Sequence, residues 1–440
     1  MTALAVRESP PLNVVLPFFL AAPLGLIAAG IMLALAGDDS VTAVTTPELL
    51  AATHGAVLGW ISLTIMGALL QLGPVLLGGR LISHRLARVQ LWLHVAGVGL
   101  MLLAFQAWRT EALVIGGSLT ALSFALFLVN ALPAVRWFAR GSLVRNFVSV
   151  SLLFLMLTVA AGFTYVLTLH YGWFPITAGR VAAHAHLGLA GFLALMLMGV
   201  SFQLVPMFQL APHDEPKFGR HVLVWMSAAT VVFAAAFWAD PPPALRLVAA
   251  AALGAGALFW MYDIAMLLHR RAKRKLDIQA KGTLASLIFL GLAIATGVIA
   301  ASGWPESLVV EHQRLQLAYA VLAIGGWAGG TLIGNSFKVV PFLIWNARYR
   351  ELAGKQPVPT LAELLDLRLA NAALATLCLA VATGAASGAL GWLEGLRMAG
   401  VVLAAAGCLQ MLTLLLVAVR RPQARAAMPT PARRIQHEGQ

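Results

Sequence analysis

Histidine is the residue type whose placement in this sequence points most directly to chemistry. His54 lies near the start of one long apolar segment, and His184 and His186 lie near the start of another. An ionisable side chain inside an apolar segment is costly and is by default a candidate functional group. Neutral imidazole is a common ligand of haem iron and of other metals. We therefore predict that these three rings ligate haem iron or copper, with His170 and His312 as weaker candidates at the same level.

The spacing of His184 and His186 limits how the two rings can act. Residues i and i+2 are about 200° apart around a helix axis, so both rings cannot hold one metal from one helix face. They can point to opposite sides, one toward the bundle centre and one toward a neighbouring helix. The alternative interpretation is that the rings only hydrogen-bond between helices. Three histidines at one depth favour cofactor ligation.

The histidines belong to an internal repeat. The segment from His54 to Pro74 and the segment from His186 to Pro206 both run twenty residues from histidine to proline (74−54 and 206−186). A third copy ends at Pro341, where Val321 takes the histidine position. These copies begin the second, sixth and tenth apolar segments, so the repeating unit is four helices used three times. Such self-similarity marks a repeat architecture.

The elements that must position these residues are transmembrane helices. Hydrophobic residues make up 60% of the 440 residues and charged residues only 11%, whereas soluble domains carry about 25% charged residues. With about 20 apolar residues per span, we expect an all-α polytopic protein of about twelve helices in a single domain, residues 1–440. The expected spans are 13–36, 50–78, 86–106, 112–132, 146–171, 182–210, 221–239, 244–268, 282–302, 311–345, 367–391 and 395–419. The repeats cover approximately residues 13–132, 146–268 and 282–419, and a basic tail occupies residues 420–440.

Charged loops predict the orientation in the membrane. The loops after even-numbered spans are basic, as in Arg270, Arg271, Lys273, Arg274 and Lys275, whereas the first loop carries Asp38, Asp39 and Glu48. By the positive-inside rule both termini are cytoplasmic, and we expect a bacterial inner membrane protein. The net charge of +13 resides in these loops, which argues against nucleic-acid binding and makes the lipid bilayer the main partner.

Two further polar residues are candidates for supporting roles. Lys338 is the repeat equivalent of Gln71 and Gln203. It is a weak proton-path candidate because a buried lysine shifts its pKa readily, although hydrogen bonds that tie the units together are the simpler interpretation. Arg180 precedes His184 by four residues and could hold a haem propionate or serve as an interfacial anchor.

The run Ala182-Ala183-His184-Ala185-His186, continued to Gly199 and Pro206, resembles the haem-ligating helix of subunit I of the haem-copper oxidases and nitric oxide reductases. That family also has twelve spans in a pseudo-threefold arrangement of four-helix units. The resemblance implies haem b as cofactor, with copper as a second candidate. It makes His54 and His186 the axial ligands of one haem and His184 a ligand at a second site. It also implies respiratory electron transfer or nitric oxide and oxygen chemistry, with a cytochrome or respiratory-complex subunit as partner.

The sequence departs from the family in ways that bear on the reaction. The family carries His-x-His in span ten, whereas here span six carries it and span ten has Tyr319 and Val321. The His-His pair that binds copper in the family is absent from this sequence, so standard oxygen reduction is not expected. NnrS-type membrane proteins, which contain haem and copper, are a similar non-standard case. The rival hypotheses are a transporter or metal-handling permease and a non-catalytic subunit of a respiratory complex.

Overall fold

The computed structural model describes residues 10–74, 80–135, 142–212, 214–239, 242–302 and 309–420. The predicted basic tail after Arg420 lies outside the described residues. Within them there is no β-strand, and twelve helices are long and apolar enough to cross a membrane. The predicted all-α polytopic fold is therefore confirmed.

Nine of the twelve spans of the described chain are continuous α-helices. They are α2 (Leu12–Ala34), α5 (His84–Gln106), α6 (Thr110–Val135), α7 (Leu143–Tyr171), α10 (Gly219–Trp238), α11 (Pro243–His269), α12 (Ile278–Ser302), α16 (Leu367–Leu390) and α17 (Leu393–Val419). Short helices η1 (Asp38–Val41) and α15 (Leu361–Leu364) lie in the connections.

The other three spans are composite, and they carry the candidate histidines or their repeat equivalent. Each consists of an α-helix, an eight-residue π-helical segment and a second α-helix. They are α3 (Pro47–His54), η2 (Gly55–Ser62) and α4 (Leu63–Leu72); α8 (Ala178–His186), η4 (Leu187–Ala194) and α9 (Leu195–Gln209); and α13 (Val309–Ala320), η6 (Val321–Ala328) and α14 (Gly329–Arg348). A π-helix has i→i+5 hydrogen bonds and is found mostly as short segments, frequently at functional sites.

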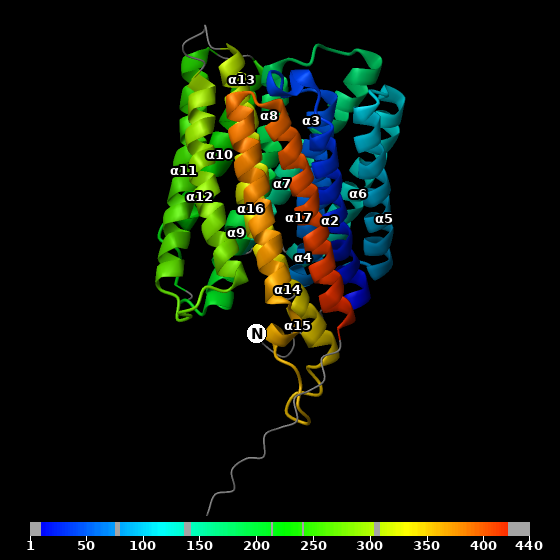
Figure 1. Ribbon diagram of the computed structural model, residues 1–440, viewed down its shortest axis with the longest axis vertical. Coiled ribbons are helices and arrows are strands. Elements are labelled where there is room, and N and C mark those ends of the chain that lie inside the picture. Colours follow the sequence, from blue (N-terminus) through cyan, green and yellow to red (C-terminus); the bar gives the residue numbers. More distant parts are fainter. Residues whose placement is uncertain are drawn as a thin grey trace, which may run out of the picture.

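The composite spans form the centre of the bundle. Buried residues make up 78%, 78% and 72% of their most apolar windows, against 22–50% in the other spans of the described chain. The other nine spans of the described chain surround them, and each composite span with three of these helices makes one of three groups of four spans. The composite spans lie among the outer helices in Figure 1. The groups meet where α6 packs on α7, α11 on α12 and α17 on α2, which closes the ring.

Glycines let the composite spans approach the first helix of each group. A methyl group on Gly191 would lie 2.5 Å from the Phe154 ring, and one on Gly326 would lie 2.6 Å from Phe289 Cβ. In the first group two backbones meet directly, because a methyl group on Gly25 would lie 2.2 Å from the Gly59 carbonyl carbon. Such close backbone approach is the usual role of small residues between membrane helices.

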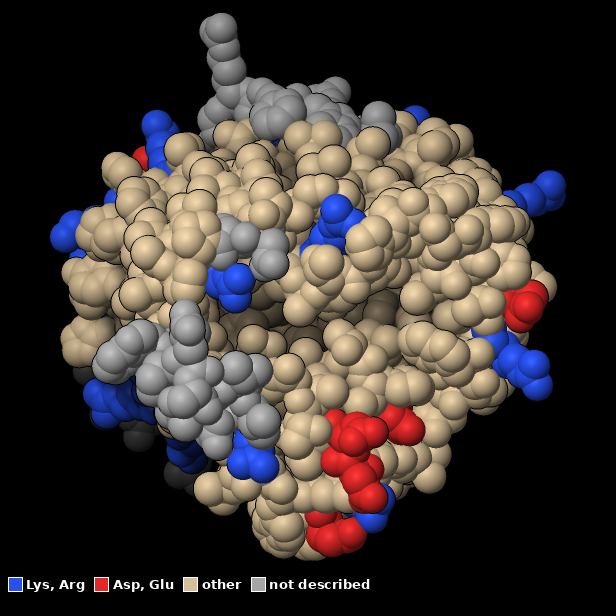
Figure 2. Space-filling model, turned by 90° about the horizontal axis from the view of Figure 1, so that it is seen from above, with Lys and Arg blue, Asp and Glu red and all other residues tan. Residues whose placement is uncertain are grey.

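The two ends of the bundle differ in charge. The histidine end, where α3, α8 and α13 begin, also carries Asp38, Asp39, Glu48 and Glu394, and Figure 2 shows acidic side chains gathered on this face beside a hollow near its centre. The opposite end, here called the basic end, carries the α11–α12 connection with Arg270, Arg271, Lys273, Arg274 and Lys275.

Candidate functional site: paired imidazoles between the helix groups

His54 and His186 share one local geometry. The Nδ1–H of His54 donates to the Leu50 carbonyl at 2.7 Å, and the Nδ1–H of His186 donates to the Ala182 carbonyl at 2.9 Å. In both cases the acceptor lies one helical turn earlier, and the π-helical segment begins at the next residue. A proton held on Nδ1 leaves the Nε2 lone pair available as an acceptor or metal ligand, which is how second-sphere carbonyls commonly orient ligating histidines.

His54 and His184 face the same interface between the first and second groups of helices. The two rings are near enough to interact electrostatically. The ring of His54 lies against Phe105 of α5 at a centroid distance of 4.9 Å. Within the described ranges its Nε2 has no hydrogen-bond partner. The lone pair of this nitrogen is therefore held in a fixed direction, and no described residue donates a hydrogen bond to it.

His184 lies in a recess on α7. A methyl group on Gly162 would lie 2.9 Å from its Cε1 and 3.5 Å from its Nε2, so the ring fits only because position 162 is glycine. Tyr165 contacts the ring edge-on at a centroid distance of 5.6 Å. The Nδ1 of His184 is buried without a hydrogen-bond partner in the described chain. An unpaired buried polar atom is costly and calls for an explanation such as a missing ligand.

His186 points to the next interface, between the second and third groups. Its Nε2 accepts a hydrogen bond from the Tyr319 hydroxyl at 3.1 Å. The ring stacks on Phe233 of α10 at a centroid distance of 4.0 Å. His186 is thus fully engaged by the protein itself.

The predicted pairing of His54 with His186 stays a prediction, but the contacts favour another partner for His54: the Tyr319 hydroxyl bonds His186 Nε2, whereas His54 and His184 interact electrostatically. The 200° separation of residues i and i+2 does send the two rings of α8 to opposite sides. The spacing does not say which imidazole meets which neighbouring group. That depends on the direction in which the three groups of helices follow one another around the bundle.

Arg180, another predicted site residue, is linked to His184 through Tyr165, whose hydroxyl donates to the Arg180 carbonyl and whose ring contacts His184. The Arg180 guanidinium is held over the rings of Phe174 and Trp238, at 5.2 and 5.1 Å from their centroids, and donates to the Pro175 carbonyl. Its Nε is buried without a partner in the described chain. The Nδ1 of His170 bonds the Thr110 hydroxyl at 3.1 Å. His312 is buried in α13 and makes no hydrogen bond to another described residue.

Lys338 takes part in a polar cluster at the basic end. Its Nζ lies 2.9 Å from Asp277 Oδ2. Asp277 lies between α11 and α12, and its Oδ1 accepts from Gln209 Nε2 and from the Ala280 backbone N–H. Burial favours the neutral acid, but these hydrogen bonds and the Lys338 ammonium outweigh it and lower the pKa of Asp277 to about 2. The ion pair joins α14 to the α11–α12 connection.

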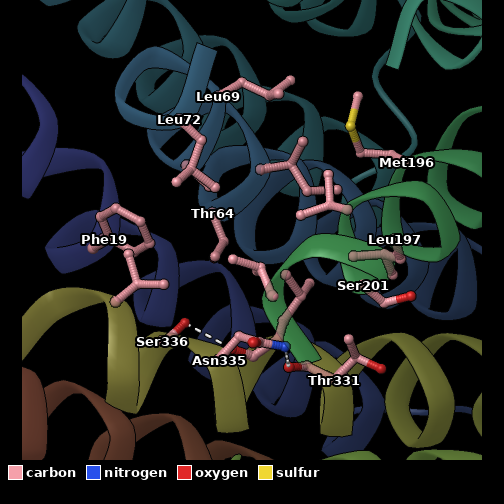
Figure 3. Close-up of a pocket in the computed structure, with 16 residues that line it drawn as sticks. Phe19, Thr64, Leu69, Leu72, Met196, Leu197, Ser201, Thr331, Asn335 and Ser336 are labelled. Carbon is pink, nitrogen blue, oxygen red and sulfur yellow. Dashed lines mark hydrogen bonds between the residues drawn. The ribbon is translucent and has the colours of Figure 1, made fainter. Parts of the chain in front are cut away.

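A cavity of about 60 Å³ lies between the three composite spans, where α4, α9 and α14 meet (Figure 3). Equivalent positions of the repeat line it: Thr64, Met196 and Thr331 at one level. The hydroxyls of Thr64 and Thr331 donate to the carbonyls of Trp60 and Trp327 within their own helices.

Several residues around the site are not evident from the sequence motifs. Tyr319 stands in the sequence only as the replacement for a histidine, whereas in the structure it is the partner of His186. Gly162 and Gly297 are 135 residues apart (297−162), and both face position-equivalent rings, His184 and Tyr319. This repeat offset is the sequence signal that could have found them.

The described residues bring potential metal-ligating side chains together in pairs and not in larger clusters. Within them no group of three His, Cys, Asp or Glu side chains converges as a metal site would require. No protein-family model and no curated protein sequence matches the chain.

Proposed function

We propose that this chain is a haem-binding integral membrane protein of haem-copper-oxidase-like architecture, acting in electron transfer or in nitric oxide or oxygen chemistry. His54 and His184 are the proposed iron ligands. The observation that carries the proposal is the pair itself: two imidazoles from different composite spans, one with an oriented and unpartnered Nε2 and the other with an orphaned buried Nδ1.

A two-histidine ligand set suits haem better than a bare ion. A structural zinc ion takes four protein ligands, and copper sites likewise use three or more. Haem brings its own four nitrogens and needs only one or two axial ligands from the protein. When bound, haem would supply the one-electron redox chemistry of its iron.

The surrounding residues have defined roles toward such a group. The Leu50 carbonyl fixes the tautomer of His54 and raises the basicity of its Nε2. Phe105 holds the His54 ring in orientation, and Gly162 provides the recess in which the His184 ring lies. Both residues lie half-buried in the apolar bundle, and a low-dielectric surround is one of the factors that set the redox potential of a haem.

Optical spectroscopy of the purified protein tests this proposal. After expression with adequate haem supply, the protein should show a Soret band that is lost or strongly diminished in His54→Ala and in His184→Ala. His221→Ala at the start of α10 is a matched control, because this substitution removes an imidazole far from the pair and should leave the spectrum unchanged. Absence of the band from wild type would sink the proposal, as would its full retention when both His54 and His184 are replaced.

The transporter hypothesis receives less support from the cavity between the composite spans. Its volume of about 60 Å³ is far below the 300–1,000 Å³ that is usual for ligand pockets. Substrate-dependent uptake into vesicles by protein without a chromophore would favour that hypothesis instead.

We also propose that the basic end faces the cytoplasm of a bacterial cell, with both termini on that side. The support is the charge asymmetry between the ends of the bundle and the positive-inside rule. A fluorescent protein fused to the C-terminus should fold and fluoresce, whereas alkaline phosphatase fused there should be inactive. The opposite pair of results would reverse the orientation.

A further inference from the structure

The pair of His54 and His184 lies at one of three equivalent places, which are the interfaces between neighbouring groups of four helices. Adding the repeat offsets to His54, His184 and Gly162 gives His186 (54+132), Tyr319 (184+135) and Gly297 (162+135). The contacts repeat as well. Gly297 faces the Tyr319 ring, since a methyl group on this glycine would lie 2.9 Å from Cδ2, just as Gly162 faces His184. Phe233 covers His186 as Phe105 covers His54.

The third place is filled with aliphatic side chains. Val321 stands at the position of His54 and His186, and Ala52 stands at the position of His184 (184−132). Both residues belong to an apolar cluster with Leu33 of α2. No ligand atom is available there among the described side chains, so this place is a packing interface.

The second place holds an imidazole that is closed off by the protein. The Tyr319 hydroxyl lies 3.1 Å from His186 Nε2. An ion held between two ligands needs about 4 Å between their donor atoms, because each metal–ligand bond is about 2 Å. The direct hydrogen bond therefore occupies the space in which a ligated iron would have to lie.

We propose that Tyr319 is the residue that closes a second copy of the haem site and limits the chain to one bis-imidazole haem. The inference rests on the proposed function. It assigns His186 to a hydrogen bond within the protein and not to iron. It also identifies the side chain that occupies the position of the iron at the second place, where a covering phenylalanine and a facing glycine are present as they are at the first.

The haem-to-protein ratio of purified variants tests this inference, with haem measured spectroscopically and protein by amino-acid analysis. Wild type should carry one haem per chain. Tyr319→His should raise the ratio toward two, because it supplies the second imidazole beside His186. Val321→His is the matched control at the third place, where Ala52 and Leu33 offer neither a ligand nor space, and its ratio should stay at one. His186→Ala should also stay at one.

The outcomes separate the two proposals. Two haems in wild type, one of them lost in His186→Ala, would overturn the role of Tyr319 and leave haem binding by the chain in place. Wild type without haem would overturn the proposed function. In that case a gain of one haem in Tyr319→His would still support the closing role of Tyr319, and no gain would overturn it. If Tyr319→His fails to accumulate, the wild-type and His186→Ala ratios decide the question.

Discussion

At the scale of single residues, His54 and His186 differ in whether their Nε2 atom has a hydrogen-bond donor. Both rings donate Nδ1–H to a carbonyl one turn earlier. Only His186 then meets a donor at Nε2, the Tyr319 hydroxyl. Sequence spacing identifies both histidines as candidates. It cannot distinguish them, because the distinguishing group lies 133 residues away in the chain (319−186).

Gly162 provides a residue-scale prediction. In Gly162→Ala the new methyl would lie 2.9 Å from His184 Cε1, so the ring must move. Overpacking of this kind costs about 1–3 kcal/mol, and we expect haem affinity to fall by about tenfold or more. Haem titration of apoprotein followed by the Soret band measures it.

Gly297→Ala is the control for that experiment. It introduces the same methyl at 2.9 Å from Tyr319 at the second place. Overpacking there should lower stability by a similar amount and leave haem affinity at the wild-type value. Equal losses of affinity in both variants would contradict the assignment of His184 as a ligand.

At the scale of elements, the three composite spans share a feature that hydropathy does not encode. Each contains eight π-helical residues at the same level, and the apolar composition of these segments is equally suited to an α-helix. The buried ring of His94 packs on the first of them, since its Nε2 donates to the Leu58 carbonyl at 3.0 Å. The π-helical segments thus lie directly beside the level of the histidines.

The contact between α2 and η2 gives a prediction at this scale. In Gly25→Ala the methyl would meet the Gly59 carbonyl carbon at 2.2 Å and the Trp60 nitrogen at 2.5 Å. Backbone atoms cannot move aside as a side chain can, so the two helices must separate, at a cost of about 3 kcal/mol or more. The apparent unfolding midpoint in detergent should fall markedly.

Gly99→Ala in α5 is the matched control, because no atom lies within 4 Å of the new methyl. Alanine is favoured over glycine by about 1 kcal/mol in a helix interior. The midpoint of this variant should therefore stay constant or rise. A fall as large as that of Gly25→Ala would show that the α2–η2 contact is not the cause.

At the scale of the whole molecule, the predicted architecture and the structure agree closely. The expected spans 86–106 and 367–391 correspond to His84–Gln106 and Leu367–Leu390. Long apolar runs separated by charged loops specify these boundaries, because the bilayer sets the length of every span. Hydropathy does not predict which side chains pair between neighbouring groups of helices, since this depends on how the groups follow one another in space.

The ion pair at the basic end gives a prediction about pH. The folded-state pKa of Asp277 is lowered to about 2, below the ordinary value near 4. Its contribution is therefore fully present above pH 4 and is lost as the pH falls toward 2. A shift of this size corresponds to at most about 2.5 kcal/mol, which solvent screening at the end of the bundle reduces. Asp277→Asn should lower the unfolding midpoint at pH 7 and by about half as much at pH 3.

Asp214→Asn is the control for the pH experiment. Asp214 pairs with Arg270 on the surface, with side chains 68% and 54% exposed, and exposed pairs contribute about 0–1 kcal/mol. Its midpoint should match wild type at both pH values. An equal loss in both variants would contradict a special role for the pair of Asp277 and Lys338.

The haem ligands are the central point: His54 and His184, and not His186, are proposed to bind one haem. Near-infrared magnetic circular dichroism of the ferric protein tests this assignment, because its charge-transfer band identifies the pair of axial ligands. We predict a bis-imidazole signature in wild type that is retained in His186→Ala and lost in His184→Ala. A signature that survives in His184→Ala and disappears in His186→Ala would show that the assignment is wrong.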